Sequence, residues 1–346
     1  MYLTEQEIMA TKDALDKTYA QVLKQEDEIR NFFRENTRRK FVFLGCGSSY
    51  MLSKSNERLF VTRPDTSAVA LAGGDYLVNP DTYLHTVENS IVLVLSRSGT
   101  TTEIVRAVEH MKKAANVKIV SITMKEKSAL EELSDLTVVL PWSYDNSVCQ
   151  TRSVTNLYTA SLLIDAICYG DEELKAAVKT AIDQNRDHME KYRAELETIG
   201  KKDFTDVIVL ADGVLCGLAE EGALAFTEIS LISGKYFNML DYRHGPKVLN
   251  GPKTLTIFAV QPNESAYQRD MIDDVKKHNG TVVTFGSEQD NVYGSDLHIS
   301  ISGISRFEAY GIPFIYTMQM IALTKALAAG GNPDAPTGLN AYITLK

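Results

Sequence analysis

The sequence repeats a pattern of apolar strands and helices, and this repeat restricts the fold more than any other feature. The strand and glycine turn FVFLGCGSSY, which begins at Phe41, returns as DVIVLADGV from Asp206. Further along the chain, SIVLVLS is matched by LTIFAV, and VKIVSIT by TVVTFGS. The three offsets are about 166, 164 and 163 residues, and a nearly constant offset favours internal duplication. We therefore expect two halves of similar architecture.

Helical stretches separate these strands and two others, Ala68–Leu71 and Leu136–Pro141. Such alternation predicts an α/β fold, in which helices cover both faces of a parallel sheet. The charged stretch from Thr4 to about Asn36 is also predicted to be helical, and Asp171 to Lys202 to be a helical connector between the halves. The expected parts are an N-terminal helix at 1–36, a first domain at 37–170, the connector at 171–202, a second domain at 203–330 and a tail at 331–346.

Composition excludes several classes of function. A chain of 346 residues, 44% hydrophobic and 23% charged, is long enough for two globular domains. Its net charge of −9 argues against nucleic acid as a partner, and no apolar segment has the length needed to span a bilayer. The cysteines and histidines show no metal-ligand spacing, and MYLTEQEIMATKD is not a secretory signal. We expect a cytoplasmic protein with no membrane contact, no metal and no cofactor.

The segment VLSRSGTTTE places hydroxyl side chains around one glycine, between a predicted strand and a predicted helix. They are Ser96, Ser98, Thr100, Thr101 and Thr102. A helix N-terminus presents unpaired N–H groups and the positive end of the helix dipole, which suits a phosphate. One or two such hydroxyls would indicate an ordinary helix cap. Five hydroxyls within seven residues favour a phosphate site instead.

A second loop is expected beside this one. Ligands of open parallel sheets bind beyond the carboxyl ends of the strands, which places Gly45–Ser49 and Ser96–Thr101 at a common edge. GCGSSY resembles a dinucleotide fingerprint only superficially, because Tyr50 replaces the third glycine, and no GxxxxGK[ST] motif occurs. Nucleotide binding is therefore the weaker alternative. The second half has Gln261-Pro262-Asn263 in place of the hydroxyls, so only the first half is expected to hold a phosphate.

The second half carries candidates for acid–base chemistry in EEGALAFTEIS and DYRHGPK. Glu221 and Glu228 are seven residues apart, which puts them near one face of a predicted helix. Glu228 has apolar neighbours in the sequence, and a carboxyl in apolar surroundings can serve as a proton shuttle. His244 precedes Gly245-Pro246 in a loop, from which it could protonate or deprotonate a sugar ring oxygen. The alternatives are a solvated helix face for the two glutamates and a simple turn histidine.

These motifs together resemble the sugar isomerase (SIS) domain family. The chain is most similar to the isomerase half of glutamine–fructose-6-phosphate amidotransferase, and it also resembles amino-sugar-phosphate deaminase/isomerases and fructosamine-6-phosphate deglycases. The resemblance extends from about Arg38 to Leu345 and includes GCGSSY, SRSGTTTE, QTRSVTNLYTA, EGALAFTEIS and RHGPK in the family's order. It implies two tandem SIS domains, each a flavodoxin-like parallel sheet between helices.

The resemblance also implies roles for individual residues. Glu228 matches the carboxylate that moves a proton between C1 and C2, and His244 matches a ring-opening histidine that acts in the neighbouring subunit's site. A homodimer with shared active sites is therefore implied. Glu221 is a further candidate for contacting the sugar. The phosphate is assigned to Ser49, Ser96, Ser98 and Thr101, and the sugar hydroxyls to Val148 and Gln150.

Departures from the amidotransferase pattern refine the expected reaction. No glutaminase domain precedes the isomerase region, so glutaminase activity is not expected. Ala225 and Ala341 stand where the amidotransferase has lysines, and Lys346 lies five residues beyond the second position. A lysine amine can form a Schiff base with a ketose, and a substrate carrying its own nitrogen at C1 would not need it. This difference favours C–N cleavage of an amino sugar or fructosamine 6-phosphate.

Two other functions remain open from the sequence. The first is simple aldose–ketose isomerisation of a 6-phosphosugar. The second is a non-catalytic phosphosugar-binding regulator, since SIS domains also occur in regulators of transcription. The roughly 35 residues before Arg38 are too few for a helix-turn-helix domain, and the retained Glu228 and His244 favour an enzyme.

Overall fold

The computed structural model describes residues 1–38, 40–263 and 265–339. The chain divides into two compact units, which are described separately below. The sequence-derived domain bounds remain predictions. Unit 1 comprises Met1–Met9, Ser147–Cys149 and Thr180–Leu339, and unit 2 comprises Ala10–Asn146 and Gln150–Lys179.

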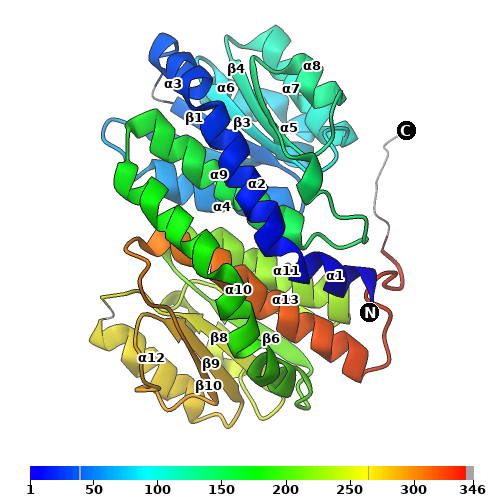
Figure 1. The fold of residues 1–346 in the computed structure, drawn as a ribbon, viewed down its shortest axis with the longest axis vertical. Coiled ribbons are helices and arrows are strands. Elements are labelled where there is room, and N and C mark those ends of the chain that lie inside the picture. Colours follow the sequence, from blue (N-terminus) through cyan, green and yellow to red (C-terminus); the bar gives the residue numbers. More distant parts are fainter. Residues whose placement is uncertain (39, 264, 340–346) are drawn as a thin grey trace. The chain divides into compact units, whose positions relative to one another are not determined.

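Unit 2 contains a five-stranded parallel sheet with the strand order β2-β1-β3-β4-β5 (Figure 1). Every residue of the central strand β3 is buried, as expected for a parallel strand with helices over both of its faces. The strands are β1 (Lys40–Gly45), β2 (Ser67–Ala72), β3 (Ile91–Ser96), β4 (Lys118–Thr123) and β5 (Leu136–Val139).

Alternation along β1 separates the two faces of this sheet. Phe41 and Phe43 pack against Phe60 of α4, whereas Val42 and Leu44 join a buried cluster with side chains of α5, α7 and α8. On the α4 side, α9 packs against α4, and α2 and α3 pack against α9. The helices are α2 (Thr11–Lys24), α3 (Glu26–Glu35), α4 (Ser48–Phe60), α5 (Gly73–Val78), α6 (Pro80–Val87), α7 (Thr102–Ala114), α8 (Ala129–Leu133) and α9 (Arg152–Tyr169).

A buried charge cluster fixes the end of α4 against α9. Arg63 donates from Nε to the two carboxylate oxygens of Asp165, at 3.1 and 3.3 Å, and from Nη1 to Asp171 at 2.8 Å. Nη2 of Arg63 also donates to Asp165, whose side chain is completely buried. The guanidinium lies 5.2 Å from the centre of the Tyr169 ring. Arg63 therefore balances a carboxylate that has lost its water.

Unit 1 contains a second five-stranded parallel sheet, with the order β10-β9-β8-β6-β7. Numbered from the first strand of each sheet, both orders are 2-1-3-4-5, the flavodoxin-like arrangement. The predicted α/β fold class is confirmed, and the shared order supports duplication. The strands are β6 (Asp206–Leu210), β7 (Ser233–Phe237), β8 (Thr254–Ala259), β9 (Thr281–Gly286) and β10 (Leu297–Ser300).

Helices cover both faces of the second sheet as well. On one face, α12 buries Met271, Ile272 and Val275 against β6, β8 and β9. On the other face, α11 packs against β6, β7 and α13. The predicted helical connector contains one long helix, α10. The helices are α1 (Leu3–Met9), α10 (Glu172–Gly200), α11 (Cys216–Ser230), α12 (Ala266–Lys276) and α13 (Gly311–Ala328).

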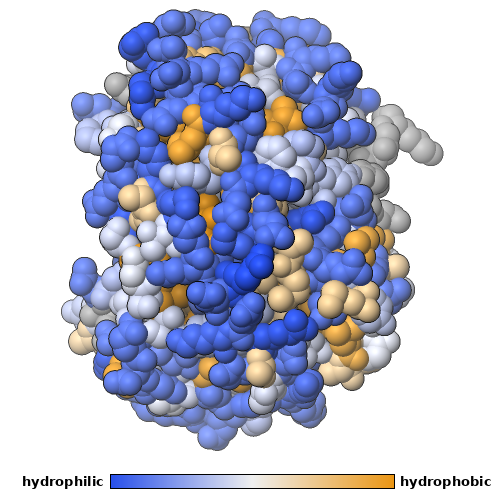
Figure 2. Space-filling model, in the orientation of Figure 1, coloured by the Kyte–Doolittle hydropathy of each residue, from blue (hydrophilic) through white to orange (hydrophobic). Residues whose placement is uncertain are grey.

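Among the described residues, no helix combines the length and apolar character that crossing a membrane requires. Figure 2 shows hydrophilic residues over most of one face of the molecule, with hydrophobic residues in small, separate groups. The large apolar side chains are concentrated instead in the sheets and in the helix faces that cover them.

Candidate functional site

The hydroxyl loop, residues 96–101, lies where the strand order of unit 2 reverses. It follows β3, and the turn after the neighbouring strand β1 leads into α4. Ser49, Ser96 and Ser98 are all buried, while Thr101 is half-buried. The carboxyl ends of adjacent parallel strands at such a reversal form the usual ligand crevice. The structure thus places both serine-rich turns at one edge of one sheet.

Hydrogen bonds within the loop fix its shape. The Ser96 hydroxyl accepts from the N–H of Gly99 at 3.0 Å, and the Ser98 hydroxyl accepts from the N–H of Thr100 at 3.2 Å. The Ser98 and Thr101 hydroxyls lie 3.4 Å apart. Thr101 directly precedes α7, so the hydroxyls and the first N–H groups of that helix are grouped together. This arrangement presents neutral donors of the kind that bind a phosphate.

Two glycines permit the close packing of these turns. A Cβ on Gly45 would lie 2.4 Å from backbone atoms of Ser49, so a side chain would push α4 away from β1. Gly99 has φ +62°, and its Cβ would lie 2.4 Å from the Ser128 hydroxyl and 2.8 Å from that of Thr123. Both positions therefore require glycine for steric reasons.

Arg97 lies in the middle of the hydroxyl loop and is a further candidate that the hydroxyl pattern does not indicate. Arg97 is only 8% exposed, and its guanidinium lies 5.8 Å from the centre of the Tyr144 ring. Its carbonyl accepts from the N–H of Met124, which fixes the backbone at this point. Arg97 provides a positive charge at a loop suited to phosphate, in a chain whose net charge is −9. In the sequence, the only indication of this role is a single arginine between two serines.

The loop that carries Val148 and Gln150 precedes α9, and both residues are half-buried. The buried Asp145 accepts from the N–H of Thr151 at 2.6 Å and from that of Ser153 at 3.0 Å. Burial raises the pKa of Asp145, and these hydrogen bonds oppose the rise. Asp145 thereby fixes the start of α9, immediately after Gln150.

In unit 1, α11 carries both candidate glutamates. Glu221 is buried in the middle of the helix, and Glu228 is half-buried in its last turn. The next residue after the helix, Leu231, is 59% exposed with φ +56°. The two glutamates therefore share a helix face but differ in their access to solvent.

His244 is exposed on a loop whose neighbouring residues are anchored in the core. Tyr242 is fully buried, and its hydroxyl accepts from Nδ2 of Asn250 at 2.8 Å. Oδ1 of Asn250 accepts in turn from the Thr256 hydroxyl at 2.9 Å. Burial raises the pKa of Tyr242 to about 12, against the opposing effect of the Asn250 hydrogen bond. Buried hydrogen bonds of Tyr242 and Asn250 thus anchor the loop on both sides of His244.

Two ion pairs hold the same loop against α12. Arg243 contacts Asp270 at 2.6 Å, and Lys247 contacts Asp274 at 2.9 Å. Because these basic residues lie on either side of His244, the loop is restrained at both ends while the imidazole remains exposed.

Glu228 and His244 lie toward opposite edges of the sheet in unit 1. The helix α11 starts just beyond the carboxyl end of β6 and has 15 residues, a length of about 22 Å, so its last turn lies toward the amino edge. The strand β7 then runs parallel to β6, and the loop of His244 follows it. This loop starts at the carboxyl edge, where Asn238 donates to Asp212 at 2.9 Å. One chain therefore does not bring this pair together.

The start of the C-terminal tail is attached to α1. Asp334 accepts from the N–H of Leu3 at 2.8 Å, and from the N–H and hydroxyl of Thr4 at 2.7 Å each. Burial tends to raise the pKa of Asp334, but these hydrogen bonds outweigh it and lower that pKa below its usual value. Ala341 and Lys346, considered above for the missing lysine, lie outside the described residues. Ala225 is buried in α11.

We expect Asp334→Asn to lower the free energy of unfolding at pH 7 by about 0.5–2 kcal/mol, because the amide loses the charge and keeps only one acceptor oxygen for the donors of Leu3 and Thr4. Because the pKa of Asp334 is lower in the folded protein than in the unfolded chain, the ionised carboxylate stabilises the fold at any pH above the ordinary carboxyl pKa. This contribution is lost as the pH falls through the pKa that Asp334 has in the folded protein. The difference in unfolding free energy between the variant and the wild type should therefore begin to shrink below about pH 4 and disappear only below the lowered pKa of Asp334. Asp290→Asn, a change at an exposed carboxylate of unit 1, is the control. A difference that persists unchanged at low pH would contradict this account.

Within the described part of the chain, no group of three or more His, Cys, Asp or Glu side chains could hold a metal ion. The candidate residues are thus a set of hydroxyls and one arginine in unit 2 and, separately, a carboxylate and an imidazole in unit 1.

Comparison with known proteins identifies similar sequences and folds. Residues 36–167 match the model of the SIS domain family, which confirms the resemblance drawn from the motifs. The chain is 24% identical to the D-galactosamine-6-phosphate deaminase AgaS of Escherichia coli over 96% of its own length and 91% of the deaminase. It is 23% identical to the glutamine–fructose-6-phosphate aminotransferase of Wigglesworthia glossinidia brevipalpis, with 94% of the chain aligned. The chain spans only 58% of that aminotransferase.

Among solved structures, the tagatose-6-phosphate ketose/aldose isomerase of Escherichia coli has a TM-score of 0.87 to this chain. The alignment covers 99% of the chain and 97% of the isomerase, at 22% sequence identity. The similarity establishes a common fold over nearly the whole chain. The family model covers the first of the two sheets, and the second has the same strand order.

Proposed function

We propose that this protein is a phosphosugar enzyme that transfers a proton between C1 and C2 of a 6-phosphosugar and cleaves a C–N bond in an amino sugar or fructosamine 6-phosphate. The observation that carries the proposal is the hydroxyl loop with Arg97 at the strand-order reversal of unit 2. The similarity to a protein named as an amino-sugar-phosphate deaminase, and to one named as a ketose/aldose isomerase, supports this substrate class.

Each candidate residue has a defined role in this proposal. Ser49, Ser96, Ser98 and Thr101 donate hydrogen bonds to the phosphate, and Arg97 balances its charge. Val148, Gln150 and Glu221 are assigned to the sugar. His244 opens the sugar ring, and Glu228 moves the proton between the two carbons. We also propose that the protein acts in the cytoplasm, as expected from its cysteine usage.

Proton transfer alone is sufficient to start cleavage when the sugar carries its own nitrogen at C1. Glu228 removes a proton from C1 of the ketoamine, and protonation of the C2 oxygen gives an enaminol. Return of the proton to C2, with loss of the N–H proton, gives an aldimine. Water then adds to C1, the amine leaves, and an aldose 6-phosphate remains. The reaction needs no lysine Schiff base, which agrees with alanine at position 225.

The test is turnover by the purified full chain, followed by mass spectrometry. The substrates are fructose 6-phosphate, glucosamine 6-phosphate, galactosamine 6-phosphate and a set of fructosamine 6-phosphates. Release of ammonia or an amine together with a sugar phosphate is the expected result. Conversion between ketose and aldose alone would identify a simple isomerase. Binding without turnover of any substrate would identify a phosphosugar-binding regulator and overturn the proposal.

The placement of Glu228 and His244 toward opposite edges of one sheet supports a homodimer with shared active sites. In such a dimer each site takes Glu228 from one copy and His244 from the other. We expect Glu228→Gln and His244→Gln to be inactive separately. When the two are mixed and the subunits exchange, about a quarter of wild-type activity should return, because half of the dimers then contain one intact site. Exchange of subunits without any return of activity would exclude a shared site.

Arg97→Gln is expected to raise KM for the phosphosugar by about 10- to 100-fold, since a hydrogen bond to a charged group contributes about 1.5–3 kcal/mol. The phosphate does not react, so kcat should change less than KM. Steady-state kinetics on a 6-phosphosugar measures both parameters. Arg106→Gln, the same substitution at an exposed position of α7, is the matched control. If KM rose equally in both variants, Arg97 would not be the residue that contacts the phosphate.

A further inference from the structure

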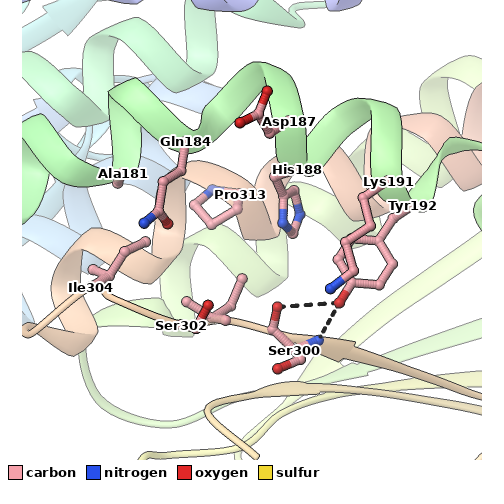
Figure 3. A pocket seen from close by; sticks show the side chains of 11 residues that line it. Ala181, Gln184, Asp187, His188, Lys191, Tyr192, Ser300, Ser302, Ile304 and Pro313 are labelled. Carbon is pink, nitrogen blue, oxygen red and sulfur yellow. Dashed lines mark hydrogen bonds between the residues drawn. The ribbon is translucent and has the colours of Figure 1, made fainter. Parts of the chain in front are cut away.

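Unit 1 contains a cavity of about 240 Å³ that includes none of the candidate residues discussed above. It lies between α10 and the segment that follows β10, with the first turn of α13 behind it (Figure 3). Its polar lining includes Gln184, His188, Lys191, Ser300 and Ser302. Figure 3 shows Gln184, His188 and Lys191 projecting from α10 toward this segment, while the carboxylate of Asp187 is directed away from it.

Two lining residues have buried polar atoms with no hydrogen-bond partner among the described residues: Ser300 at Oγ and His188 at Nε2. An unsatisfied buried polar atom costs about 1–3 kcal/mol, and native proteins contain few of them. Burial, with a smaller effect from Lys191, lowers the pKa of His188 to about 4. The imidazole is therefore neutral at neutral pH and has one donor and one acceptor nitrogen. Both orphaned groups are suited to ligand hydroxyls.

Lys191 is the only lysine or arginine among the described residues that line the cavity. Its ammonium lies 4.7 Å from the centre of the Tyr192 ring, which holds it beside the cavity. The Tyr192 hydroxyl is already used, since it accepts from the N–H of Ser300 at 2.9 Å and lies 3.3 Å from the Ser300 carbonyl. The backbone at Ser300 is thus fixed, and the serine hydroxyl remains available.

The apolar part of the lining is provided by Ala181, Ile301, Ile304 and Pro313. At about 30 Å³ per water molecule, the cavity has the volume of about eight waters, close to that of one monosaccharide. A sugar ring offers the matching surface, because its C–H faces suit aliphatic side chains and its hydroxyls suit Ser, Gln and neutral His. The single cation adds a preference for one anionic group.

We propose that this cavity is a second ligand site, which binds a small polyhydroxylated compound carrying one anionic group, either a carboxylate or a phosphate. Lys191 contacts the anionic group, and Ser300, His188 and Gln184 contact the hydroxyls. The inference goes beyond the proposed function, because it rests on none of the residues assigned to catalysis or to the phosphate loop.

The test is isothermal titration calorimetry of the full chain with gluconate, glucose 6-phosphate and glucose. Gluconate reports on the cavity because it has no phosphate, and its comparison with glucose 6-phosphate distinguishes the two anionic groups. At least one of the two anions should bind saturably, and glucose at least about tenfold more weakly. Ser300→Ala and Lys191→Met should each weaken that binding about tenfold or more. Lys201→Met, the same change at an exposed lysine that does not line the cavity, should leave it unchanged.

Ser300→Ala removes a buried hydroxyl that lacks a partner, so the unliganded variant should be as stable as the wild type or more stable. Loss of binding in this variant cannot then be attributed to unfolding. Binding of neither anion, or binding that Ser300→Ala and Lys191→Met leave unchanged, would overturn the proposal. If glucose bound as tightly as the anions, the assigned role of Lys191 would be wrong. Retained turnover in the cavity variants, and retained gluconate binding in Ser98→Ala, would separate this site from the proposed active site.

Discussion

Glu228→Gln is expected to lower kcat by about 10²- to 10⁴-fold, with KM changed only a few-fold, because an amide of the same shape cannot take up the proton from carbon. The side chain is half-buried in the last turn of α11, a position that allows contact with a substrate without opening the helix. The direct measurement is exchange of the C1 and C2 hydrogens of the substrate with deuterated water, together with steady-state turnover.

Glu220→Gln is the matched control for this prediction, since it makes the same change eight residues earlier on the same helix. It is expected to exchange hydrogen at nearly the wild-type rate. If Glu228→Gln kept both exchange and turnover, another group would have to be the base. If both variants lost their activity and were also unfolded, the loss of activity would result from lower stability rather than from a missing catalytic base.

Arg63→Met is expected to lower the free energy of unfolding of unit 2 by about 3–5 kcal/mol. The reason is the completely buried carboxylate of Asp165, which would lose several hydrogen bonds from the guanidinium and the positive charge that balances it. Urea unfolding, followed by circular dichroism, measures the change. We expect a lower urea concentration at the unfolding midpoint and a similar dependence of the unfolding free energy on urea. This result is expected when a variant loses stability without a change in the surface that unfolding exposes.

Two comparisons make this prediction specific. Arg58→Met, five residues earlier in the last turn of α4 and with its side chain 55% exposed, should change the unfolding free energy by less than about 1 kcal/mol. The double variant Arg63→Met/Asp165→Leu should recover part of the loss, because the completely buried carboxylate is then removed as well. A double variant no more stable than Arg63→Met would show that packing around Arg63, rather than the buried charge of Asp165, causes the loss.

Much of the fold could be predicted because its signals are local and repeated. The apolar runs of β1, β3, β4, β6, β8 and β9 are buried on both faces and therefore contain few polar residues. The strands β7 and β10 lie at the two edges of their sheet, and their sequences, SGKYF and LHIS, are short and partly polar. Such edge strands were not recognised because tertiary pairing, rather than their own pattern, makes them strands.

The candidate site was predictable only where its residues are close in the sequence. The hydroxyl loop is one continuous segment, so its composition alone indicates a phosphate site. Arg97 was missed because a single arginine among serines usually belongs to the solvated surface. The interval between Glu228 and His244 gave no indication that they lie toward opposite edges of a sheet, since β7 and its pairing decide this. The cavity beside α10 combines residues more than 100 positions apart, which no local pattern reveals.

The attachment of Asp334 to α1 joins residues 330 positions apart, at nearly opposite ends of the described chain. A ribosome adds about 5–20 residues per second, so the first helix emerges roughly 17–66 seconds before its capping carboxylate is made. During that interval α1 has seven residues and no cap from Asp334, and isolated helices of this length are marginal in water. Completion of unit 1 must therefore await the synthesis of Asp334. A nascent chain released before that point would leave its N-terminus accessible to proteases, whereas a chain that includes Asp334 would protect it.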